Sequence, residues 1–344
     1  MGKYISVIIP CHNCAESVET TWQSLKKQTI GIDNLECIFV DDASDDGGAT
    51  WSMLQKIEHE EPESVMIIHL DENMRQGGAR NVALNYCSGE YLMFLDADDV
   101  FLPESCEIAF GVINDNSADI VQFNHIRRIG ENQKVFEDIK QNVFFEIKSS
   151  SERNRFLDAS TVTYGCWNKI YRLSLVRKSE AKFSEHTVYE EPLFVYPCFL
   201  YATKLVLITD ALYVYNIHSG STVTSLIGKR IFDHPKVQLE LLGYCIKRPE
   251  LYSEYRDAIG IYFLWTYFCE TICFSAQQEI EGLLTLDYFK GMQEVCRHFF
   301  SDWRENSYLN RIPKNVQDSL KGIEREFETQ KELNEYVKYT ASRI

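Results

Sequence analysis

The chain is short of basic residues. Its 344 residues include 51 Asp and Glu but only 35 Lys and Arg, which gives a formal net charge of −16 at pH 7. A protein that neutralises nucleic-acid phosphates over a broad face needs a surplus of Lys and Arg. The composition therefore excludes that class of protein and predicts no nucleic-acid partner, although a local basic site is still compatible with it.

No leader and no long apolar run is visible in the sequence. Met1-Gly2-Lys3 runs directly into a strand pattern, with no small-residue cleavage site after an apolar stretch. The aromatic-rich run from Ile259 to Phe274 contains Thr266, Glu270 and Thr271, and it falls short of the roughly 18–20 apolar residues that a membrane span needs. We predict a cytoplasmic protein in which this run is a buried helix. An interfacial helix, with peripheral association at the inner face of the cell membrane, is the alternative.

A disulfide framework is not indicated either. The 11 cysteines are odd in number and spread through apparent core segments, which favours reduced, buried thiols. Cys11 and Cys14 form a Cys-x-x-Cys pair, but a zinc site needs a second ligand pair and a redox site needs a thioredoxin-like context. The sequence contains neither, so buried thiols are the favoured interpretation, for Cys269 and Cys273 as well.

Short β-branched runs alternate with amphipathic stretches in the first third of the chain. The runs are typical of strands that are covered on both faces, and the stretches between them carry apolar stripes at helical spacing. This alternation predicts an α/β fold with a mainly parallel sheet. The strand candidates are Tyr4–Ile9, Glu36–Val40, Val65–His69, Tyr91–Leu95 and Asp119–Phe123.

The rest of the chain suggests a loop, two further strands and then helices. Residues Arg127 to Lys148 are polar and poorly periodic, which predicts a loop that covers a site. Strand candidates at Lys204–Thr209 and Leu212–Ile217 close the α/β part, and helical patterns without strands run from about Gly228 to the end. We therefore predict two domains, residues 1–227 and residues 228–344.

Two acidic clusters follow predicted strands. Asp96, Asp98 and Asp99 come directly after Tyr91–Leu95, and Asp41 and Asp42 come after Glu36–Val40. Ligands of open α/β sheets bind beyond the carboxyl ends of the strands, and two carboxylates in one tight turn can hold Mg²⁺ or Mn²⁺. An Asp-x-Asp pair is weak by itself, because acidic turn residues often bond their own backbone. A second cluster at the same edge strengthens the prediction of a metal site.

Several motifs in order along the chain resemble those of family 2 glycosyltransferases with the GT-A fold. They are Val7-Ile8-Ile9-Pro10, Val40-Asp41-Asp42-Ala43-Ser44-Asp45-Asp46-Gly47, Asn73 with Gly77-Gly78-Ala79-Arg80-Asn81, Leu95-Asp96-Ala97-Asp98-Asp99, Trp167-Asn168-Lys169-Ile170-Tyr171 and Glu190-Glu191-Pro192-Leu193-Phe194. The resemblance covers the α/β part and leaves the helical C-terminal region outside. It implies a Rossmann-like GT-A fold with helices on both faces of the sheet.

The resemblance also implies a nucleotide site. Pro10 and the loop after it, including Asn13, border the nucleotide in this interpretation. Asp42 accepts a hydrogen bond from the uracil imide N–H, and Asp41 supports the same turn. A carboxylate distinguishes an imide from base edges that lack that donor. For Asp41, a turn cap without contact to the nucleotide is the alternative.

The metal and the diphosphate are assigned by the same resemblance. Asp98 is implied as the principal ligand of a divalent metal, Mn²⁺ or Mg²⁺, and Asp96 as a contact to the ribose or, through water, to the metal. Arg80 offers donors to phosphate or sugar, or it forms an ion pair with the Asp41 cluster. His218 lies where related enzymes close over the diphosphate, and a surface histidine is the alternative.

The acceptor side contains a departure from the family pattern. Its motif normally reads Glu-Asp with the Asp as catalytic base, whereas Glu191 occupies that position here. Glu190 is the alternative base, and both acids are also explained as charges at a helix N-terminus. Trp167 and Lys169 are implied on the acceptor side, where a tryptophan can stack on a sugar. A core tryptophan and a pair between Lys169 and the Glu190 cluster are the alternatives.

The predicted function is the inverting transfer of a sugar from a UDP-sugar to an acceptor hydroxyl on a polysaccharide or lipid-linked oligosaccharide. A nucleotidyltransferase is the second interpretation, but Pro10-Cys11-His12-Asn13 is neither glycine-rich nor basic as its phosphate loop would be. A noncatalytic nucleotide-sugar or carbohydrate-binding protein is the third. The helical C-terminal region could complete the acceptor site, form a homo-oligomer or dock on a membrane-bound assembly.

Overall fold

The computed structural model describes residues 3–157, 162–217, 228–278 and 280–343. The chain consists of two compact units, Met1–Lys148 with Tyr164–Thr224, and Ser149–Thr163 with Ser225–Ile344. The units divide at Ser225, close to the predicted boundary at Gly228. The membership of Ser149–Thr163 in the second unit is a feature that the sequence does not indicate.

The first unit is built on a single mixed sheet, which has ten strands within the described residues. The strands are β1 (Ile5–Cys11), β2 (Leu35–Asp41), β3 (Val65–His69), β4 (Tyr91–Phe94), β5 (Val100–Phe101), β6 (Ile120–Ile129), β7 (Asn132–Phe136), β8 (Val143–Glu146), β9 (Lys169–Arg172) and β10 (Lys204–Ile217). Their order is β3-β2-β1-β4-β9-β6-β10-β5, with β7 paired to β6 and β8 paired to β10. Strands β1 to β4 pair in parallel, and β9 runs antiparallel to β4 and β6.

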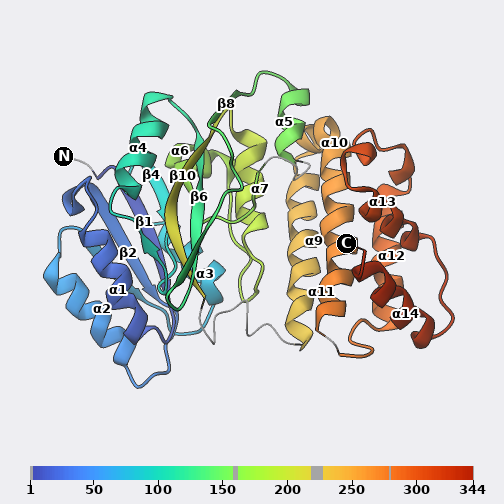
Figure 1. Cartoon of the computed structure of the whole chain (residues 1–344), viewed down its shortest axis with the longest axis horizontal. Helices are drawn as coiled ribbons and strands as arrows, with labels where there is room; N and C mark the ends of the chain where they lie inside the picture. Colours follow the sequence, from blue (N-terminus) through green and yellow to red (C-terminus); the bar gives the residue numbers. More distant parts are fainter. Residues whose placement is uncertain (1–2, 158–161, 218–227, 279, 344) are drawn as a thin grey trace. The chain divides into compact units, whose positions relative to one another are not determined.

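Helices cover both faces of this sheet (Figure 1). On one face lie α1 (Ala15–Lys26), α2 (Ala49–Glu60) and α4 (Ser105–Asp115), and a short 3₁₀ turn, Ile32–Asn34, precedes β2. On the other face lie α3 (Arg75–Leu84), α6 (Leu173–Ser179) and α7 (Pro192–Tyr201). This arrangement agrees with the predicted α/β class of a mainly parallel sheet between two helical layers.

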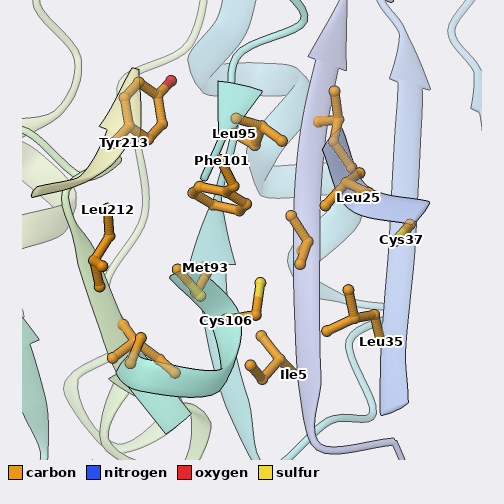
Figure 2. Packing of buried hydrophobic residues seen from close by; sticks show 14 of the residues in the cluster. Ile5, Leu25, Leu35, Cys37, Met93, Leu95, Phe101, Cys106, Leu212 and Tyr213 are labelled. Carbon is orange, nitrogen blue, oxygen red and sulfur yellow. The ribbon is translucent and has the colours of Figure 1, made fainter. Parts of the chain in front are cut away.

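Alternation along the strands divides the core between the two faces. Met93 belongs to the hydrophobic cluster under α1, α2 and α4, which Figure 2 shows together with side chains from β1, β2 and β10. Its neighbour Phe94 points the other way, where its ring meets Phe183 and Phe194 with centroid distances of 5.4 and 5.1 Å. Successive residues of a strand face opposite sides, so a continuous apolar run is needed when both faces are covered.

Three sequence predictions about elements need correction. Strand β1 runs through Pro10 to Cys11, because Pro10 lies beyond the residues that pair with β4 and its missing N–H breaks no bond on that side. The two predicted strands at 204–217 are one irregular strand, β10, with register shifts after Ile208 and Ala211. The predicted loop from Arg127 to Lys148 contains the end of β6, β7 and β8, because strand pairing rather than an apolar pattern forms them.

The second unit is helical throughout its described part, as predicted from the sequence. Its elements are α5 (Ser150–Leu157), η2 (Gly228–Phe232), α9 (Asp233–Ile246), α10 (Pro249–Phe263), the π-helical stretch η3 (Leu264–Glu270), α11 (Thr271–Gln277), α12 (Leu286–Phe300), η4 (Trp303–Glu305), η5 (Leu309–Arg311), α13 (Lys314–Leu320), η6 (Lys321–Ile323) and α14 (Gln330–Ala341). Helix α5 joins this unit through hydrogen bonds from Arg153 to the hydroxyl of Tyr255 and from Asn154 to the hydroxyl of Tyr308.

The aromatic-rich run lies inside a continuous helical segment. Residues Pro249–Gln277 are long and apolar enough to cross a membrane by length and composition, with a mean hydropathy of 1.3 over the most apolar window. However, 83% of that window is buried inside the structure. The segment therefore has the burial expected of a core helix, which agrees with the prediction for Ile259 to Phe274.

The cysteines are free thiols. All 11 lack disulfide partners, and Cys14 is the one that is partly exposed while the others are buried. Cys11 and Cys14 flank the turn between β1 and α1, and Cys269 and Cys273 lie in the core of the second unit. The prediction of mostly buried thiols agrees with this burial.

Candidate active site

A cavity of about 330 Å³ lies at the edge of the sheet where the parallel strands β1, β2 and β4 end. Loops after these strands line it, together with two segments from elsewhere in the chain. The lining residues are Pro10, Cys11, His12, Asn13, Cys14, Ser17, Asp42, Asn73, Arg75, Gln76, Asp96, Ala97, Asp98, Thr187 and Val188. The cavity thus brings together five residues that were predicted to bind donor or metal, namely Pro10, Asn13, Asp42, Asp96 and Asp98.

Asp41 and Asp42 have different surroundings, although they are neighbours at the end of β2. Asp41 Oδ1 accepts from the N–H and the hydroxyl of Ser44 at 3.2 and 2.5 Å, and its Oδ2 lies 2.8 Å from Nδ1 of His69. Asp42 Oδ1 accepts from the N–H of Met74 at 2.7 Å, and burial raises the pKa of this carboxyl. Of the two, Asp42 lines the cavity. Asp41 therefore supports the turn, and Asp42 is placed to meet a ligand.

The side chains of the acidic residues after β4 also point in different directions. Asp98 is half-buried at the cavity, and its carbonyl accepts from Nδ2 of Asn216 at 2.6 Å. Asp99 is fully buried, and its carboxylate accepts from the hydroxyl of Tyr213 at 2.6 Å and the N–H of Asn216 at 2.7 Å. Burial, with the nearby charges of Asp96 and Asp98, raises the pKa of Asp99 to about 9. Asp99 therefore holds β10 against the turn, whereas Asp96 and Asp98 line the cavity.

Arg80 joins two acidic residues from distant parts of the chain. Its side chain is 1% exposed, and its Nη2 and Nη1 donate to Oδ1 of Asp96 and Oε1 of Glu190, each at 2.6 Å. The guanidinium also lies 5.2 Å from the ring centroid of Phe183. The predicted ion pair with the Asp41 cluster is wrong, because α3 presents Arg80 to β4 and to the segment before α7. Arg80 is not among the residues that line the cavity, so its influence on a ligand there passes through Asp96.

Helix α3 accepts the segment before α7 by close packing and by paired hydrogen bonds. A Cβ at Gly77 would lie 2.3 Å from the carbonyl oxygen of Ser184 and 3.0 Å from Cγ of Glu190, so a side chain there would push the segment away. Nδ2 of Asn81 donates to the carbonyl of Phe183 at 2.9 Å, and its Oδ1 accepts from the N–H of Phe183 at 2.8 Å. These contacts fix the position of the two glutamates that follow.

Glu190 and Glu191 differ in the groups that surround them. Glu190 is buried against Arg80, and burial raises its pKa to about 7 although the Arg80 charge opposes that shift. Glu191 is half-buried just before α7, and its Oε1 accepts from the N–H of Cys166 at 2.7 Å. Among the described residues, none bonds to Oε2 of Glu191. That oxygen is therefore open to another group, which Glu190 in its pair with Arg80 is less able to accept.

Trp167 and Lys169, both predicted on the acceptor side, lie in different environments. Trp167 is half-buried, with its ring stacked on Tyr215 at 5.9 Å and edge-on to His125 at 4.9 Å. Lys169 is 0% exposed, its Nζ donates to the carbonyl of Gly165 at 2.6 Å, and burial lowers its pKa to about 7. The predicted acceptor contact of Lys169 is therefore wrong, because β9 lies between β4 and β6 and buries this side chain.

The loops after β1 and β2 are bonded to each other at the mouth of the cavity. Nδ2 of Asn13 donates to Oδ1 of Asp45 at 2.6 Å, and the N–H of Asp45 donates to Oδ1 of Asn13 at 2.9 Å. Nδ1 of His12 lies 2.9 Å from the carbonyl oxygen of Asp42. Asn13 thus shapes the wall that it was predicted to form, with one face of its amide already used inside the protein.

The cavity offers oxygen ligands to a hard cation without a complete protein cage. In the part of the chain that the structure describes, no group of three or more His, Cys, Asp or Glu side chains is placed to hold a metal alone. Asp98 and Asp96 supply carboxylates, and Mg²⁺ is commonly held by one or two carboxylates with substrate phosphates and water. These residues therefore fit a cation whose remaining ligands come from a bound diphosphate. His218 lies outside the described residues.

Several cavity residues were not predicted. Asn73, Arg75 and Gln76 stand at the start of the same motif that ends with Arg80, and that continuity is a signal that could have indicated them. His186 donates its backbone N–H to the carbonyl of Met74 at 2.9 Å, and this contact holds Thr187 and Val188 at the cavity. No motif in the sequence indicates that these two residues belong to the site. The lining residues outside the predicted set are Ser17, Asn73, Arg75, Gln76, Thr187 and Val188.

Solved structures share this fold. The crystal structure of Staphylococcus aureus TarS 1–349 in complex with UDP superposes with a TM-score of 0.70 at 18% identity, and the match covers 98% of this chain and 90% of that one. The TarS 1–349 complex with UDP-GlcNAc has a TM-score of 0.61 at 19% identity, covering 92% and 91% of the two chains. The likeness confirms the predicted GT-A type of fold.

Proteins similar in sequence to this chain include named glycosyltransferases. Glycosyltransferase GlyG of Streptococcus pneumoniae is 22% identical over 300 residues, covering 80% of this chain and 95% of GlyG. A cholesterol galactosyltransferase of Borreliella burgdorferi is 25% identical over 281 residues, covering 77% and 74% of the two chains. The model of the family described as "Glycosyl transferase family 2" matches residues 6–179. This match spans half of the chain and includes the acidic clusters at the ends of β2 and β4, so the chain belongs to glycosyl transferase family 2.

Proposed function

We propose that this glycosyltransferase moves a sugar from a UDP-sugar to a hydroxyl of a polysaccharide or glycolipid acceptor, with inversion at the anomeric carbon. The observation that carries the proposal is that Asp42 and Asp98, which follow two parallel strands, line the same cavity. Membership of a glycosyltransferase family sets aside the nucleotidyltransferase interpretation. The UDP and UDP-GlcNAc complexes of TarS support a uridine nucleotide as the donor.

The donor binds with its base at Asp42 and its diphosphate at Asp98. Asp42 accepts from the uracil imide N–H, and the turn held by Asp41 keeps this carboxylate in place. Pro10 and Asn13 form the wall beside the nucleotide. Asp98, with Asp96 close by, would hold Mn²⁺ or Mg²⁺. When bound, such a cation supplies charge neutralisation for the departing diphosphate.

Glu191 serves as the base for the acceptor. Its Oε1 is held by the N–H of Cys166, which leaves Oε2 to take the proton of the acceptor hydroxyl. The hydroxyl oxygen forms a bond to the anomeric carbon while the bond from that carbon to the diphosphate oxygen breaks. Trp167 lies on the acceptor side, where its half-buried ring can stack on a sugar. One base and one displacement give inversion.

The proposal is tested by UDP release from a panel of UDP-sugars, with Mn²⁺ and with soluble oligosaccharide or glycolipid acceptors. We expect release with a subset of donors, loss of release on chelation and recovery with Mn²⁺ or Mg²⁺. Asp98→Asn should abolish release, while Asp115→Asn, at the exposed end of α4, should leave it unchanged. UDP release from none of the donors, by a folded protein that binds UDP, would favour a noncatalytic binding protein.

Location and assembly are part of the same proposal. A donor made in the cytoplasm and a lipid-linked acceptor meet at the inner face of the cell membrane, which is where we place the reaction. The helical second unit is then available to complete the acceptor site, to dimerise or to dock on a membrane-bound assembly. Fractionation of cells, with the chain sedimenting with membranes and released by high salt, supports the peripheral location.

A further inference from the structure

Strands β10, β6 and β7 form a surface of the first unit whose residues are separate from those that line the cavity. Their register places two rows of side chains across the sheet, first Tyr213, His125 and Phe136, and then Tyr215, Arg127 and Lys134. Paired residues of neighbouring strands present their side chains on the same face. Burial falls from the first row to the second, since His125 is 4% exposed whereas Arg127 and Lys134 are exposed. A ligand can therefore reach the second row.

Arg127 and Lys134 form a pair of like charges. They are direct partners in the register of β6 and β7, and both cations lie over the ring of Phe136, at 4.0 and 5.2 Å from its centroid. Like charges directly opposite each other on an antiparallel pair are destabilising. Within the described residues, neither side chain has a hydrogen bond or an ion pair with another group. The protein itself therefore leaves two adjacent positive charges without a counter-ion.

This pair contrasts with the acidic character of the whole chain, whose formal net charge is −16. Two other exposed cations of the first unit, Lys56 and Lys148, each lie beside a glutamate, at 3.6 and 2.8 Å. Many acids are thus available to the chain, and none is placed to pair with Arg127 or Lys134 among the described residues. The two residues form a local basic site, and a guanidinium beside an ammonium fits an anionic ligand.

The first row contains a second group without a partner. Neither ring nitrogen of His125 has a hydrogen bond in the described part of the chain, although the side chain is buried. Burial lowers the pKa of this imidazole, and the charge of Arg127 lowers it further, while the charge of Asp138 opposes the shift. The ring is stacked on Phe136 at 5.3 Å and edge-on to Trp167 at 4.9 Å. A buried polar group without a partner costs about 1–3 kcal/mol, so stability alone does not explain this row.

Trp167 connects these rows to the proposed base. Its ring is stacked on Tyr215 at 5.9 Å, and Tyr215 is the partner of Arg127 in the register of β10 and β6. A Cβ at Gly165 would lie 3.2 Å from Nε1 of Trp167 and 3.8 Å from Oε1 of Glu191, so the indole and the carboxylate approach the same backbone. The tryptophan proposed to stack on a sugar is therefore packed against the segment of Glu191 and against the row that contains the cations.

We propose that Arg127 and Lys134 bind an anionic group of the acceptor, a phosphate or a carboxylate, beyond the sugar that stacks on Trp167. The inference rests on the proposed function and deepens it, because it makes the acceptor an anionic glycan or glycolipid. A neutral glycan has no group that needs two adjacent cations. The diphosphate of the donor is the other anion that this enzyme meets, and its proposed place is the cavity, so UDP binding separates the two interpretations.

A binding experiment tests the inference without requiring turnover. Polyphosphate, oligogalacturonate and a neutral maltooligosaccharide, each labelled with the same fluorophore, are titrated with the full chain in EDTA, and fluorescence anisotropy gives the dissociation constants. Without a divalent cation, the carboxylates of Asp42, Asp96 and Asp98 repel an anion from the cavity, so anion binding reports on a site outside it. Separate calorimetry with UDP and Mn²⁺ reports on the cavity.

The test variant replaces both cations, Arg127→Gln with Lys134→Gln. The matched control combines Lys56→Gln with Lys148→Gln, which removes the same charge from exposed positions that have carboxylate partners. All four side chains are exposed, so both proteins should fold and keep a melting temperature close to that of the wild type. Thermal unfolding of the three proteins checks this.

We expect the wild type and the control to bind one of the anions at least about tenfold more tightly than the neutral oligosaccharide. The test variant should lose most of this preference and keep wild-type UDP binding. The anion that binds more tightly identifies phosphate or carboxylate as the group recognised.

Four outcomes overturn the inference. They are a wild type without preference for either anion, equal anion binding by the wild type and the test variant, an equal loss in the control, and a loss of UDP affinity in the test variant. The third would make overall charge the cause, and the fourth would make the donor diphosphate the anion that is bound. A wild type that prefers anions but releases no UDP from any donor contradicts the proposed function and leaves the anion site standing.

Discussion

The ends of β2 and β4 carry neighbouring acidic residues that the fold uses in opposite ways. At β2, Asp41 is bonded to Ser44 and His69, whereas Asp42 lines the cavity. At β4, Asp99 is buried against Tyr213, whereas Asp98 lines the cavity. Successive residues at the end of a strand point to opposite sides, which separates Asp41 from Asp42, whereas Asp98 and Asp99 are separated by the turn that follows β4. Each pair therefore supplies one acid that fixes the loop and one that can meet a ligand.

The two glutamates before α7 also differ in this way, although they do not follow a strand. Glu190 turns inward to Arg80, and Glu191 keeps one carboxylate oxygen without a partner among the described residues. Glu190 differs from Glu191 in having its charge matched by a buried cation of the protein. Each acidic doublet thus contains one carboxylate bonded inward and one that lines the cavity or keeps an oxygen without a partner among the described residues, and we predict that this division is one between a structural and a functional acid.

The largest expected effect concerns Glu190 and Glu191. Glu191→Gln should lower kcat by about 10²–10⁴-fold, the usual contribution of a general base, with the dissociation constant of UDP unchanged. Glu190→Gln should lower it by about tenfold at most, because its amide oxygen still accepts from Arg80. Steady-state rates and UDP calorimetry on both variants provide the measurement. A greater loss in Glu190→Gln would make Glu190 the base and reverse the division in this pair.

The second prediction concerns stability and Arg80, the buried cation that joins Asp96 to Glu190. Arg80→Met removes the partner of buried Glu190 and half-buried Asp96, and breaking a buried ion pair in this way costs about 3–5 kcal/mol. We expect the free energy of unfolding of the first unit to fall accordingly in urea titrations. Lys26→Met, which breaks the partly exposed pair with Glu60, is the control and should cost about 1 kcal/mol or less. Equal losses would show that Arg80 is not an anchor.

The fold could be predicted from the sequence where the apolar run of a strand is continuous. Strand β3 has the predicted bounds Val65–His69, and β2 differs from its predicted bounds by one residue at each end. The pairing of β6 with β7 gave no such signal. The side chains of Asn132–Phe136 are mostly exposed, so hydrogen bonds to β6 rather than an apolar pattern hold the strand.

The site, like the fold, could be predicted in part from the sequence. Acids directly after an apolar strand must emerge at the carboxyl edge of the sheet, so Asp42 and Asp98 could be placed from sequence alone. The partner of Arg80 could not, because Glu190 reaches it through packing of a distant segment on Gly77. The opposite directions of Asp41 and Asp42 follow from strand alternation, but only the hydrogen bonds to Ser44 and His69 show which of the two is structural.

The third effect separates Asp41 from Asp42. Asp42→Ala should weaken UDP binding by about 1–3 kcal/mol, since the imide N–H loses its acceptor, and should lower the free energy of unfolding less than Asp41→Ala does, because it releases the N–H of Met74 alone and burial already opposes the charge of this carboxylate. Asp41→Ala should lower the free energy of unfolding by about 1–3 kcal/mol, since Ser44 and His69 lose their partner. UDP calorimetry and urea titrations on both variants give the four numbers. If Asp41→Ala loses UDP affinity at unchanged stability, the division at β2 fails.

The smallest expected effect concerns a basic residue, Lys169, which is buried and which we therefore expect to be structural. Its pKa of about 7 in the folded protein lies below the value of about 10.4 expected when unfolded, so between these values the unfolded chain binds the extra proton. Lys169 should therefore contribute a rise in the free energy of unfolding with pH from about 7 upward, of up to about 1.4 kcal/mol per pH unit, against the fall that Asp99, with its pKa raised to about 9, contributes over the same range. Lys169→Met should remove this slope, whereas Lys56→Met, at an exposed site, should keep it. Urea titrations at pH 7, 8 and 9 measure the slopes.

The same variant tests whether Lys169 is structural or reaches the acceptor. Because its Nζ is buried and bonded to the carbonyl of Gly165, Lys169→Met should leave the KM for the acceptor unchanged while the pH slope disappears. Trp167→Ala, at the half-buried position on the same segment, should raise that KM, since the ring is the group that can stack on a sugar. If Lys169→Met raises the KM for the acceptor and keeps the pH slope, Lys169 contacts the acceptor and is not a buried structural residue.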